Sequence, residues 1–300
     1  MDIVGFHIEP TNICTLTCAG CARTRFINQW PQHWKNHSLD IDKLLKFIDI
    51  DLVGKTIALC GNYGDPIYHP NFIELVINLK SQGAIVSIVT NGSYRKQEWW
   101  EELVGNLTST DSITFSIDGI PRNFIEYRVN ADWDSIETGM RVVANSVCNS
   151  MWKYIPFSFN QSNIEEAREL SDSLGIKNFY LECSDRFDDQ TEFLKPTDLL
   201  IGSRYNPQVY WKSNNANLTV NPKCHRGQEH FITADGYYSP CCYLADHRFY
   251  YKTPFGKNKS QYNIREHTLS EILQQPQTVK FYQTLDQQPG CQYNCPKIAG

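Results

Sequence analysis

The sequence predicts an α/β fold of parallel strands that alternate with helices, followed by a small cysteine-rich extension. Strand-like apolar runs and amphipathic helical runs alternate up to residue 183, which favours parallel strands joined by helical crossovers. A polar stretch without a clear period then precedes a last quarter that holds five cysteines. We therefore expect three parts: a strand–helix domain at 1–183, a linker or substrate-facing loop at 184–223, and a separate extension at 224–300.

The first part is expected to contain about six strand–helix units. Strands are predicted where apolar, β-forming residues run up to polar or glycine-rich ends. Clear examples are 4–8, 56–60, 85–89 and 113–115. Helices are predicted from the amphipathic runs at 39–49, 71–81, 96–105, 133–147 and 164–174. Ser38 is expected to cap the first of these helices, with Asp40 in its first turn, where a negative charge suits the helix dipole.

The extension should begin with a β-hairpin. Asp235 and Gly236 lie between β-forming residues, and an Asp-Gly pair in that position is a strong hairpin signal. Two helical runs follow, at 269–274 and 278–285. Pro276 is expected to break or kink the chain between them.

Composition favours an intracellular metalloenzyme. The chain has 300 residues, 41% of them hydrophobic, and a net charge of −5, so charge gives no reason to expect a nucleic acid or an anionic membrane as partner. The N-terminus shows no signal-peptide core, and no stretch approaches the ~18 apolar residues of a membrane span. The eleven cysteines are therefore interpreted as metal ligands and reduced thiols in the cytoplasm.

Three cysteines near the N-terminus carry the most specific signal. Cys14, Cys18 and Cys21 form a CxxxCxxC run that follows directly on the first predicted strand. Thiolates select iron–sulfur clusters or zinc, and a [4Fe–4S] cluster normally takes four cysteines. Three ligands would leave one iron open for a small molecule. A zinc loop, which usually shows paired CxxC knuckles, or three unrelated thiols remain the alternatives from this run alone.

Together with four polar strand ends, the run resembles the signature of the radical S-adenosylmethionine (SAM) superfamily. The resemblance covers about residues 3–183 and implies a partial (β/α)6 barrel, with the site at the carboxyl ends of the strands. It implies that Cys14, Cys18 and Cys21 hold a [4Fe–4S] cluster whose open iron chelates SAM. The positions that it assigns to the SAM site are Gly61, Asn62, Tyr63, Gly64, Asp65, Thr90, Asn91, Ser116, Asp118 and Arg128.

The chain departs from the family pattern at several of these positions. Asn62 and Tyr63 separate two glycines that are adjacent in the family's "GGEP" turn, and Asp65 replaces Glu. Gly20 stands where the family often has an aromatic residue near the adenine, so the adenine contact is left unassigned. Arg128 either contacts a carboxylate of SAM or substrate or is a solvated arginine at a helix end.

The late cysteines resemble the SPASM/Twitch extension of radical SAM enzymes. Cys224, Gly236 and Cys241 match the opening of that extension, and Cys291 with Cys295 would complete four ligands to an auxiliary iron–sulfur cluster, expected to be [4Fe–4S]. The chain has too few spaced cysteines for two auxiliary clusters, which favours the single-cluster Twitch form over full SPASM. A four-cysteine zinc site is the alternative. Cys242 is spare in this scheme, and Cys60, Cys148 and Cys183 are expected to be buried, inert thiols.

The resemblance implies an enzyme that cleaves SAM reductively and abstracts hydrogen from a substrate C–H bond with the 5′-deoxyadenosyl radical. A flavodoxin- or ferredoxin-type protein would supply the electron. A peptide or protein side chain is the leading substrate class, because many SPASM/Twitch relatives modify peptides. The alternatives are a methylthiotransferase acting on protein or RNA, a dehydrogenase of a small alcohol or sugar, and a non-catalytic iron–sulfur or zinc protein.

Overall fold

A computed structural model describes residues 3–182, 184, 187, 191, 194–197, 224 and 230–295. The chain divides into two compact units. The first unit comprises residues 1–13, 36–85 and 213–300, and the second comprises residues 14–35 and 86–212. Cys183 and most of the expected linker lie outside the described residues. The domain boundaries expected at 183 and 223 therefore stay predictions.

The first unit joins the two N-terminal strands to the C-terminal hairpin. Strand β1 (Gly5–Ile8) pairs in parallel with β2 (Thr56–Leu59) on one edge and with β7 (Phe231–Ile232) on the other. β7 turns back antiparallel into β8 (Tyr238–Ser239), so the predicted hairpin is confirmed. The helices are α2 (Ile41–Phe47), α3 (Phe72–Ser81), α9 (Cys242–Ala245), α10 (His247–Tyr250), α11 (Pro254–Lys257), α12 (Leu269–Gln274), α13 (Pro276–Gln283) and α14 (Pro289–Asn294).

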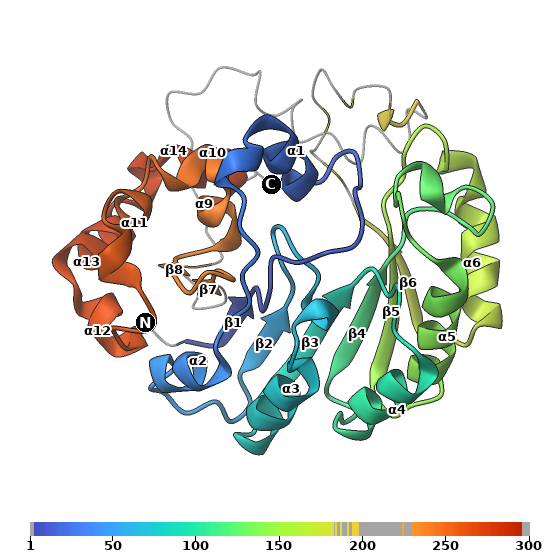
Figure 1. The fold of residues 1–300 in the computed structure, drawn as a ribbon, viewed down its shortest axis with the longest axis horizontal. Helices are drawn as coiled ribbons and strands as arrows, with labels where there is room; N and C mark the ends of the chain where they lie inside the picture. The colour runs from blue at the N-terminus through green and yellow to red at the C-terminus, as the bar shows by residue number, and fades with distance from the viewer. Residues whose placement is uncertain are drawn as a thin grey trace. The chain divides into compact units, whose positions relative to one another are not determined.

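The second unit carries four parallel strands. They are β3 (Ile85–Thr90), β4 (Ser112–Ser116), β5 (Asn149–Tyr154) and β6 (Asn178–Leu181), each paired with the next along the chain. Helices α4 (Gln97–Gly105), α5 (Trp133–Ala144) and α6 (Ile164–Ser173) follow β3, β4 and β5 and lie along one side of these strands (Figure 1). Helix α1 (Ala22–Gln29) follows the cysteine loop directly. The predicted α/β class with parallel strands is confirmed, and the sheet is open.

Large side chains fix the helices of the second unit on its strands. Trp100 on α4 is fully buried and contacts Phe115 on β4, with ring centroids 5.4 Å apart. Gly139 on α5 makes room for it, since a Cβ there would lie 2.6 Å from the Trp100 ring. Such interlocking leaves little freedom to the strands whose ends carry the predicted site residues.

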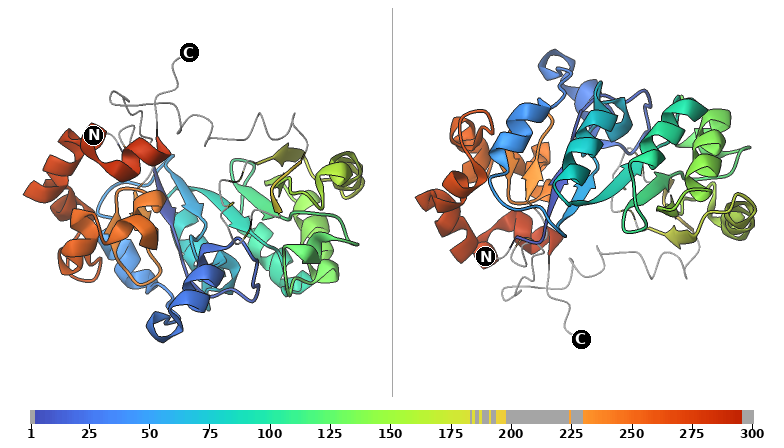
Figure 2. Two further views of the ribbon diagram at one scale, coloured as in Figure 1. Left: turned by 90° about the horizontal axis from the view of Figure 1, so that it is seen from above. Right: turned by 90° about the horizontal axis from the view of Figure 1, so that it is seen from below.

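An aromatic core holds the C-terminal helices against the hairpin of the first unit. Phe255 on α11 is fully buried and contacts Tyr238 of β8 at 6.1 Å and Phe281 of α13 at 5.0 Å between ring centroids. In both views of Figure 2 these helices gather beside the hairpin. The extension is therefore a packed continuation of the β1–β2 strands.

Helix α2 begins differently from the expectation, and α13 begins at the expected proline. The Ser38 cap is wrong: Asp40 is the N-cap of α2 and accepts a hydrogen bond from Lys43 N at 3.1 Å. The Ser38 hydroxyl instead lies 2.9 Å from the Thr11 hydroxyl, in a bridge between the two segments. Pro276 does separate α12 from α13, and it does so as the first residue of α13, where its missing N–H costs nothing.

None of the described helices is both long enough and apolar enough to cross a membrane.

Candidate functional site

The cysteine loop of the second unit lies against an apolar bed. Cys18 is 6% exposed and packs with Leu16, Tyr127 and Phe157. Cys14 and Cys21 are partly buried and contact the same cluster. Cys21 is also the N-cap of α1, and its N–H donates to Cys18 O at 3.1 Å. All three thiols thus belong to one short loop that is anchored by a buried leucine and a helix start.

Burial makes the thiolate form of Cys18 costly, and it raises the pKa of this thiol to about 11. The nearby Arg128 guanidinium acts in the opposite direction and lowers it. A metal ligand must be deprotonated, so a cluster bound here supplies much of the compensating charge. Three thiols with one adjacent cation in an apolar surrounding fit the donor set of an iron–sulfur cluster.

The ends of β3 and β4 meet in the same part of the second unit. Thr90 at the end of β3 lies opposite Phe115 of β4 in the parallel register, one residue before Ser116. Asn91 follows Thr90, and its side-chain amide donates toward Cys14 Sγ at 3.6 Å. The structure therefore brings Thr90, Asn91 and Ser116 to one edge, with Asn91 beside the first cysteine.

Arg128 is the centre of a buried polar group. Its guanidinium donates to Asp118 Oδ2 at 2.8 Å and to Ser116 Oγ at 2.8 Å. The side chain is 15% exposed and that of Asp118 is fully buried, so the alternative of a solvated arginine does not hold. The ion pair with Asp118 raises the pKa of Arg128 against the opposing effect of burial. The cation stays charged and lies next to Cys18.

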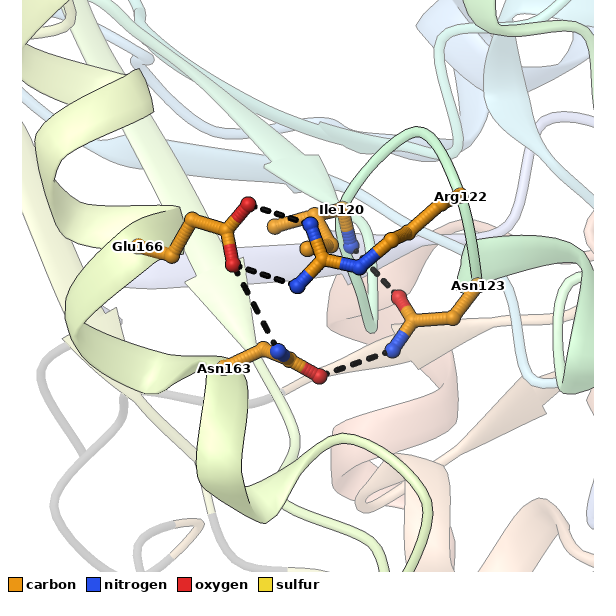
Figure 3. A network of polar contacts seen from close by, with 5 residues as sticks. All are labelled: Ile120, Arg122, Asn123, Asn163 and Glu166. Atoms are coloured by element: carbon orange, nitrogen blue, oxygen red, sulfur yellow. Dashed lines mark hydrogen bonds and ion pairs between the residues drawn. The ribbon is translucent and has the colours of Figure 1, made fainter.

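The loop after β4 is shaped by asparagine side chains. Asn123 Oδ1 accepts a hydrogen bond from Ile120 N at 2.9 Å, and its amide donates to Asn163 Oδ1 at 2.9 Å. Arg122 and Glu166 form a two-pronged ion pair above this network (Figure 3). Gly119, at φ +147°, allows the chain to turn where a Cβ would lie 2.7 Å from Phe124 Cα. These contacts hold the loop that carries Asp118.

The glycine-rich turn at 61–65 belongs to the first unit. Gly64 lies directly on the segment before Cys14: a Cβ there would be 1.9 Å from Thr11 O. Asp65 N donates to Ile13 O at 3.0 Å, and Asp65 Oδ1 accepts from Ile67 N at 3.3 Å. The turn is thus fixed against the chain that leads into the cysteine loop.

Asn62 and Tyr63, the two departures from the family turn, contact the C-terminal extension. Asn62 Nδ2 donates to Cys242 O at 2.8 Å. The Tyr63 hydroxyl accepts from His247 N at 3.0 Å and lies 3.3 Å from His247 Nδ1. Their side chains are therefore engaged with the extension, which leaves the turn's backbone as the part able to meet a ligand.

Glu9 and Tyr127 are two residues that the sequence analysis missed. Glu9, at the end of β1, is 2% exposed and accepts hydrogen bonds from Tyr63 N at 2.7 Å and Gly64 N at 3.1 Å. Tyr127 fills the space beside Gly20, since a Cβ on that glycine would lie 3.0 Å from the Tyr127 hydroxyl. An acidic residue that ends an apolar strand was the available signal for Glu9. Nothing local to Gly20 pointed to Tyr127, which comes from a distant loop.

The late cysteines lie on elements of the first unit that contact one another. Cys241 is the N-cap of α9, which packs on α14; this helix holds Cys291, and Cys295 is its C-cap. Cys295 N donates to Cys291 O at 2.8 Å, so these two are one helical turn apart. Cys224 and Cys241 both lie near Tyr238 and Tyr282, and their charges raise the pKa of these phenols further beyond the effect of burial. Cys224 and Cys241 thus lie near the same two tyrosines, and Cys291 and Cys295 belong to the helix that packs on α9.

Within the described part of the chain, no three His, Cys, Asp or Glu side chains converge closely enough to hold a single metal ion. Cys242 is partly buried, and its carbonyl accepts the Asn62 bond. Of the thiols expected to be buried, Cys148 is buried, but Cys60 is partly exposed because it lies where β2 gives way to the glycine turn.

Two family models match the chain. That of the radical SAM superfamily matches residues 8–177, more than half of the chain. One described as an iron-sulfur cluster-binding domain, SPASM, matches residues 224–296.

One curated relative is the tungsten-containing aldehyde ferredoxin oxidoreductase cofactor-modifying protein of Pyrococcus furiosus. It is 29% identical over 119 residues, which are 38% of this chain and 31% of that protein. The match thus spans less than a third of the relative's length.

The fold is similar to several solved structures. SuiB of Streptococcus suis with bound S-adenosylmethionine has a TM-score of 0.65 at 13% identity, over 93% of this chain and 68% of SuiB. Native anSMEcpe with AdoMet and the Cp18Cys peptide has 0.60 at 13%, over 93% and 82%. BtrN with AdoMet and 2-DOIA has 0.51 at 16%, over 98% and 93%. At these identities the similarity establishes a shared fold.

Proposed function

Because this chain belongs to the radical SAM superfamily, we propose that it abstracts a hydrogen atom from a peptide or protein side chain at the carboxyl ends of its strands. It is a radical SAM enzyme that uses a [4Fe–4S] cluster, SAM and an auxiliary iron–sulfur cluster. The observation that carries the proposal is the placement of Cys14, Cys18 and Cys21 beside Asn91, Arg128 and Asp118 in one unit.

The cysteine loop is the part of the chain that would hold the SAM cluster. When bound and reduced, that cluster supplies the electron that splits SAM into methionine and the 5′-deoxyadenosyl radical. Leu16, Ile155 and Phe157 belong to the apolar cluster that packs against this loop, and an apolar surrounding protects a reactive intermediate from side reactions. Cys14 and Cys21 remain partly exposed.

The SAM contacts are proposed for strand ends and the glycine turn. Thr90, Asn91, Ser116 and Asp118 lie together in the second unit. Arg128 is already paired with Asp118, and its positive charge lies beside Cys18. It is a proposed contact for a carboxylate only through the guanidinium N–H groups that these bonds leave available. The backbone of 61–65 is proposed to receive the SAM amino group.

Four cysteines are proposed to ligate the auxiliary cluster: Cys224, Cys241, Cys291 and Cys295. Full ligation leaves no iron free for substrate, so an electron relay suits this cluster better than sulfur donation. A flavodoxin- or ferredoxin-type reductant and a cytoplasmic location are proposed together with it.

The peptide substrate class is supported by two fold neighbours, which were solved with a precursor peptide and with the Cp18Cys peptide. BtrN, with a similar fold, was solved with 2-DOIA. A peptide substrate is therefore proposed first, and a small-molecule substrate is the alternative.

The central test is SAM cleavage by anaerobically reconstituted protein. Wild type should form 5′-deoxyadenosine, and the Cys14→Ala/Cys18→Ala/Cys21→Ala variant should form none while it loses about four irons per chain. Undiminished cleavage by the variant would refute the assignment of this loop.

The substrate class can be tested by isotope transfer. An extract of fully deuterated cells should pass deuterium into 5′-deoxyadenosine, as measured by mass spectrometry. Protease treatment of the extract should abolish the transfer if the substrate is a peptide. Transfer that survives protease in the small-molecule fraction would support the dehydrogenase alternative, and a methylthiolated product would support the methylthiotransferase.

A further inference from the structure

Glu9 is a buried carboxylate outside the SAM-site residues named above. It follows directly on β1, where Ile8 pairs with Leu59 of β2, and it is 2% exposed. Burial of a carboxylate costs free energy unless hydrogen bonds satisfy it. It lies one residue past the strand and contacts the turn that follows β2.

One oxygen of Glu9 holds the turn's backbone. Oε1 accepts from Tyr63 N at 2.7 Å and from Gly64 N at 3.1 Å, two consecutive amides of the 61–65 turn. Gly61 closes over the same oxygen, because a Cβ on Gly61 would lie 2.7 Å from it. The carboxylate thus holds two consecutive amides of this turn, with Gly61 packed against the same oxygen.

Glu9 also reaches the C-terminal hairpin. Ala234 N–H donates a hydrogen bond to its carboxylate, and Glu9 N donates to Ile232 O at 2.9 Å. The turn is held from its other side by Asn62, which donates to Cys242 O. One buried side chain therefore ties the glycine turn to the hairpin that precedes Cys241.

We propose that Glu9 is the positioning residue of the 61–65 turn, which it presets for SAM and joins to the auxiliary-cluster extension. Glu9 does not itself touch the ligand in this scheme. Its contribution is preorganisation: amides already bound to a carboxylate need no reordering when SAM arrives. The inference rests on the proposed function, since it takes the 61–65 backbone as the SAM amino-group site.

The pKa of Glu9 is in line with this arrangement. Burial raises it to about 7, while the amides of Tyr63, Gly64 and Ala234 lower it and the charge of Asp235 raises it further. Burial of the charged carboxylate costs free energy. The hydrogen bonds from the backbone amides explain better than packing alone why the side chain lies in the interior.

The test uses anaerobically reconstituted full-length protein with Glu9→Ala, Glu9→Gln and Asp111→Asn. Asp111 is the matched control: it is also fully buried and also binds two backbone amides, Val86 N and Thr108 N at 2.7 Å each. It precedes β4, at the opposite end of that strand from Ser116.

Binding of SAM is measured by equilibrium dialysis, together with iron content and the EPR spectrum of the reduced protein with and without SAM. Glu9→Ala should weaken SAM binding about tenfold or more, since bonds to a charged group are lost, with iron content unchanged. Glu9→Gln keeps one acceptor oxygen and should recover part of the affinity. Both variants should reduce the SAM-induced change of the EPR spectrum, and Asp111→Asn should not.

Equal SAM affinity in wild type and Glu9→Ala would overturn the inference. So would an equal loss in Asp111→Asn, which would show a general effect of lost stability. If Glu9→Ala does not fold, wild-type affinity in Glu9→Gln together with an unaltered EPR response overturns it as well. Wild type that binds no SAM would instead refute the proposed function, so the two failures are distinguishable.

Discussion

Arg128 shows how much of the site depends on single side chains. It is one partner of a buried ion pair with Asp118 and also bonds Ser116. Removing one member of such a pair leaves an uncompensated charge in the interior.

We predict that Arg128→Met lowers the free energy of unfolding by about 3 kcal/mol or more. Arg128→Met/Asp118→Asn should regain much of that loss, because no buried charge remains. Arg122→Met, in the exposed pair with Glu166, is the matched control and should have a far smaller effect. Denaturant unfolding measures all four proteins, and equal losses at 122 and 128 would contradict the prediction.

His230 makes the free energy of unfolding depend on pH. It is fully buried, its Nδ1 lies 2.9 Å from the Tyr238 hydroxyl, and burial lowers its pKa to about 4. Below pH 6.5 the unfolded chain binds a proton here that the folded chain does not. Stability from this group is therefore complete above pH 6.5 and is lost as the pH falls toward 4.

We predict that wild type loses about 1.4 kcal/mol between pH 7.5 and 5.5 through His230. His230→Phe should lack this part of the pH dependence, although it also loses the bond to Tyr238. Unfolding midpoints at several pH values give the two slopes. Parallel slopes for variant and parent would show that His230 takes up its proton equally in the folded and unfolded chains, which contradicts the prediction.

At the scale of elements, the glycine turn is constrained more tightly than its sequence suggests. If the backbone of this turn approaches a ligand closely, a side chain at Gly64 obstructs that ligand. The structure shows that a Cβ would first collide with the backbone of Thr11 and Asn12. These two residues lie just before the cysteine loop.

Gly64→Ala should therefore already weaken SAM binding by about tenfold, because the segment that leads to Cys14 must shift, and Gly64→Val should weaken it further and lower iron loading as well. Gly105→Ala, at the end of α4 with nothing within 4 Å of the added carbon, should leave both unchanged. Dialysis with SAM and iron analysis measure the effects. Wild-type affinity in Gly64→Ala would show that the turn is misassigned.

The loop after β4 is a second element whose shape depends on residues outside it. Asp118 lies in a segment whose shape comes from Gly119, Asn123 and the contact of Asn123 with Asn163 at the start of α6. Polar residues are common at strand ends. Here the start of a helix from the next strand–helix unit contacts the loop after β4 and holds it in place.

At the scale of the whole molecule, the number of clusters can be measured directly. Replacing Cys224, Cys241, Cys291 and Cys295 by serine should halve the iron of the anaerobic wild type, if both centres hold four irons. Mössbauer or EPR spectra of wild type should show two distinct clusters. Zinc in place of the second cluster would refute the Twitch interpretation, and retention of more than half the iron would refute this ligand set.

The sequence by itself determined the family, the cofactor class and the order of the elements. Cys14, Cys18 and Cys21 are ligands whose spacing lies within one loop, and the Asp-Gly pair at 235–236 encodes a turn within two residues. Such local patterns can be interpreted without the fold, because the atoms that matter are close along the chain. The strand–helix alternation has the same property, since its period follows from backbone geometry.

Only the tertiary structure decided which distant groups complete these local patterns. Asp40 rather than Ser38 caps α2 because Ser38 is taken by Thr11, and Tyr127 fills the space beside Gly20 from a remote loop. Arg128 is only 15% exposed because it is paired with the buried Asp118, and Glu9 matters because the turn after β2 and the C-terminal hairpin both direct amides at it. A buried polar group is stabilised by whichever partner the fold brings within hydrogen-bond distance, and chain spacing does not encode that distance.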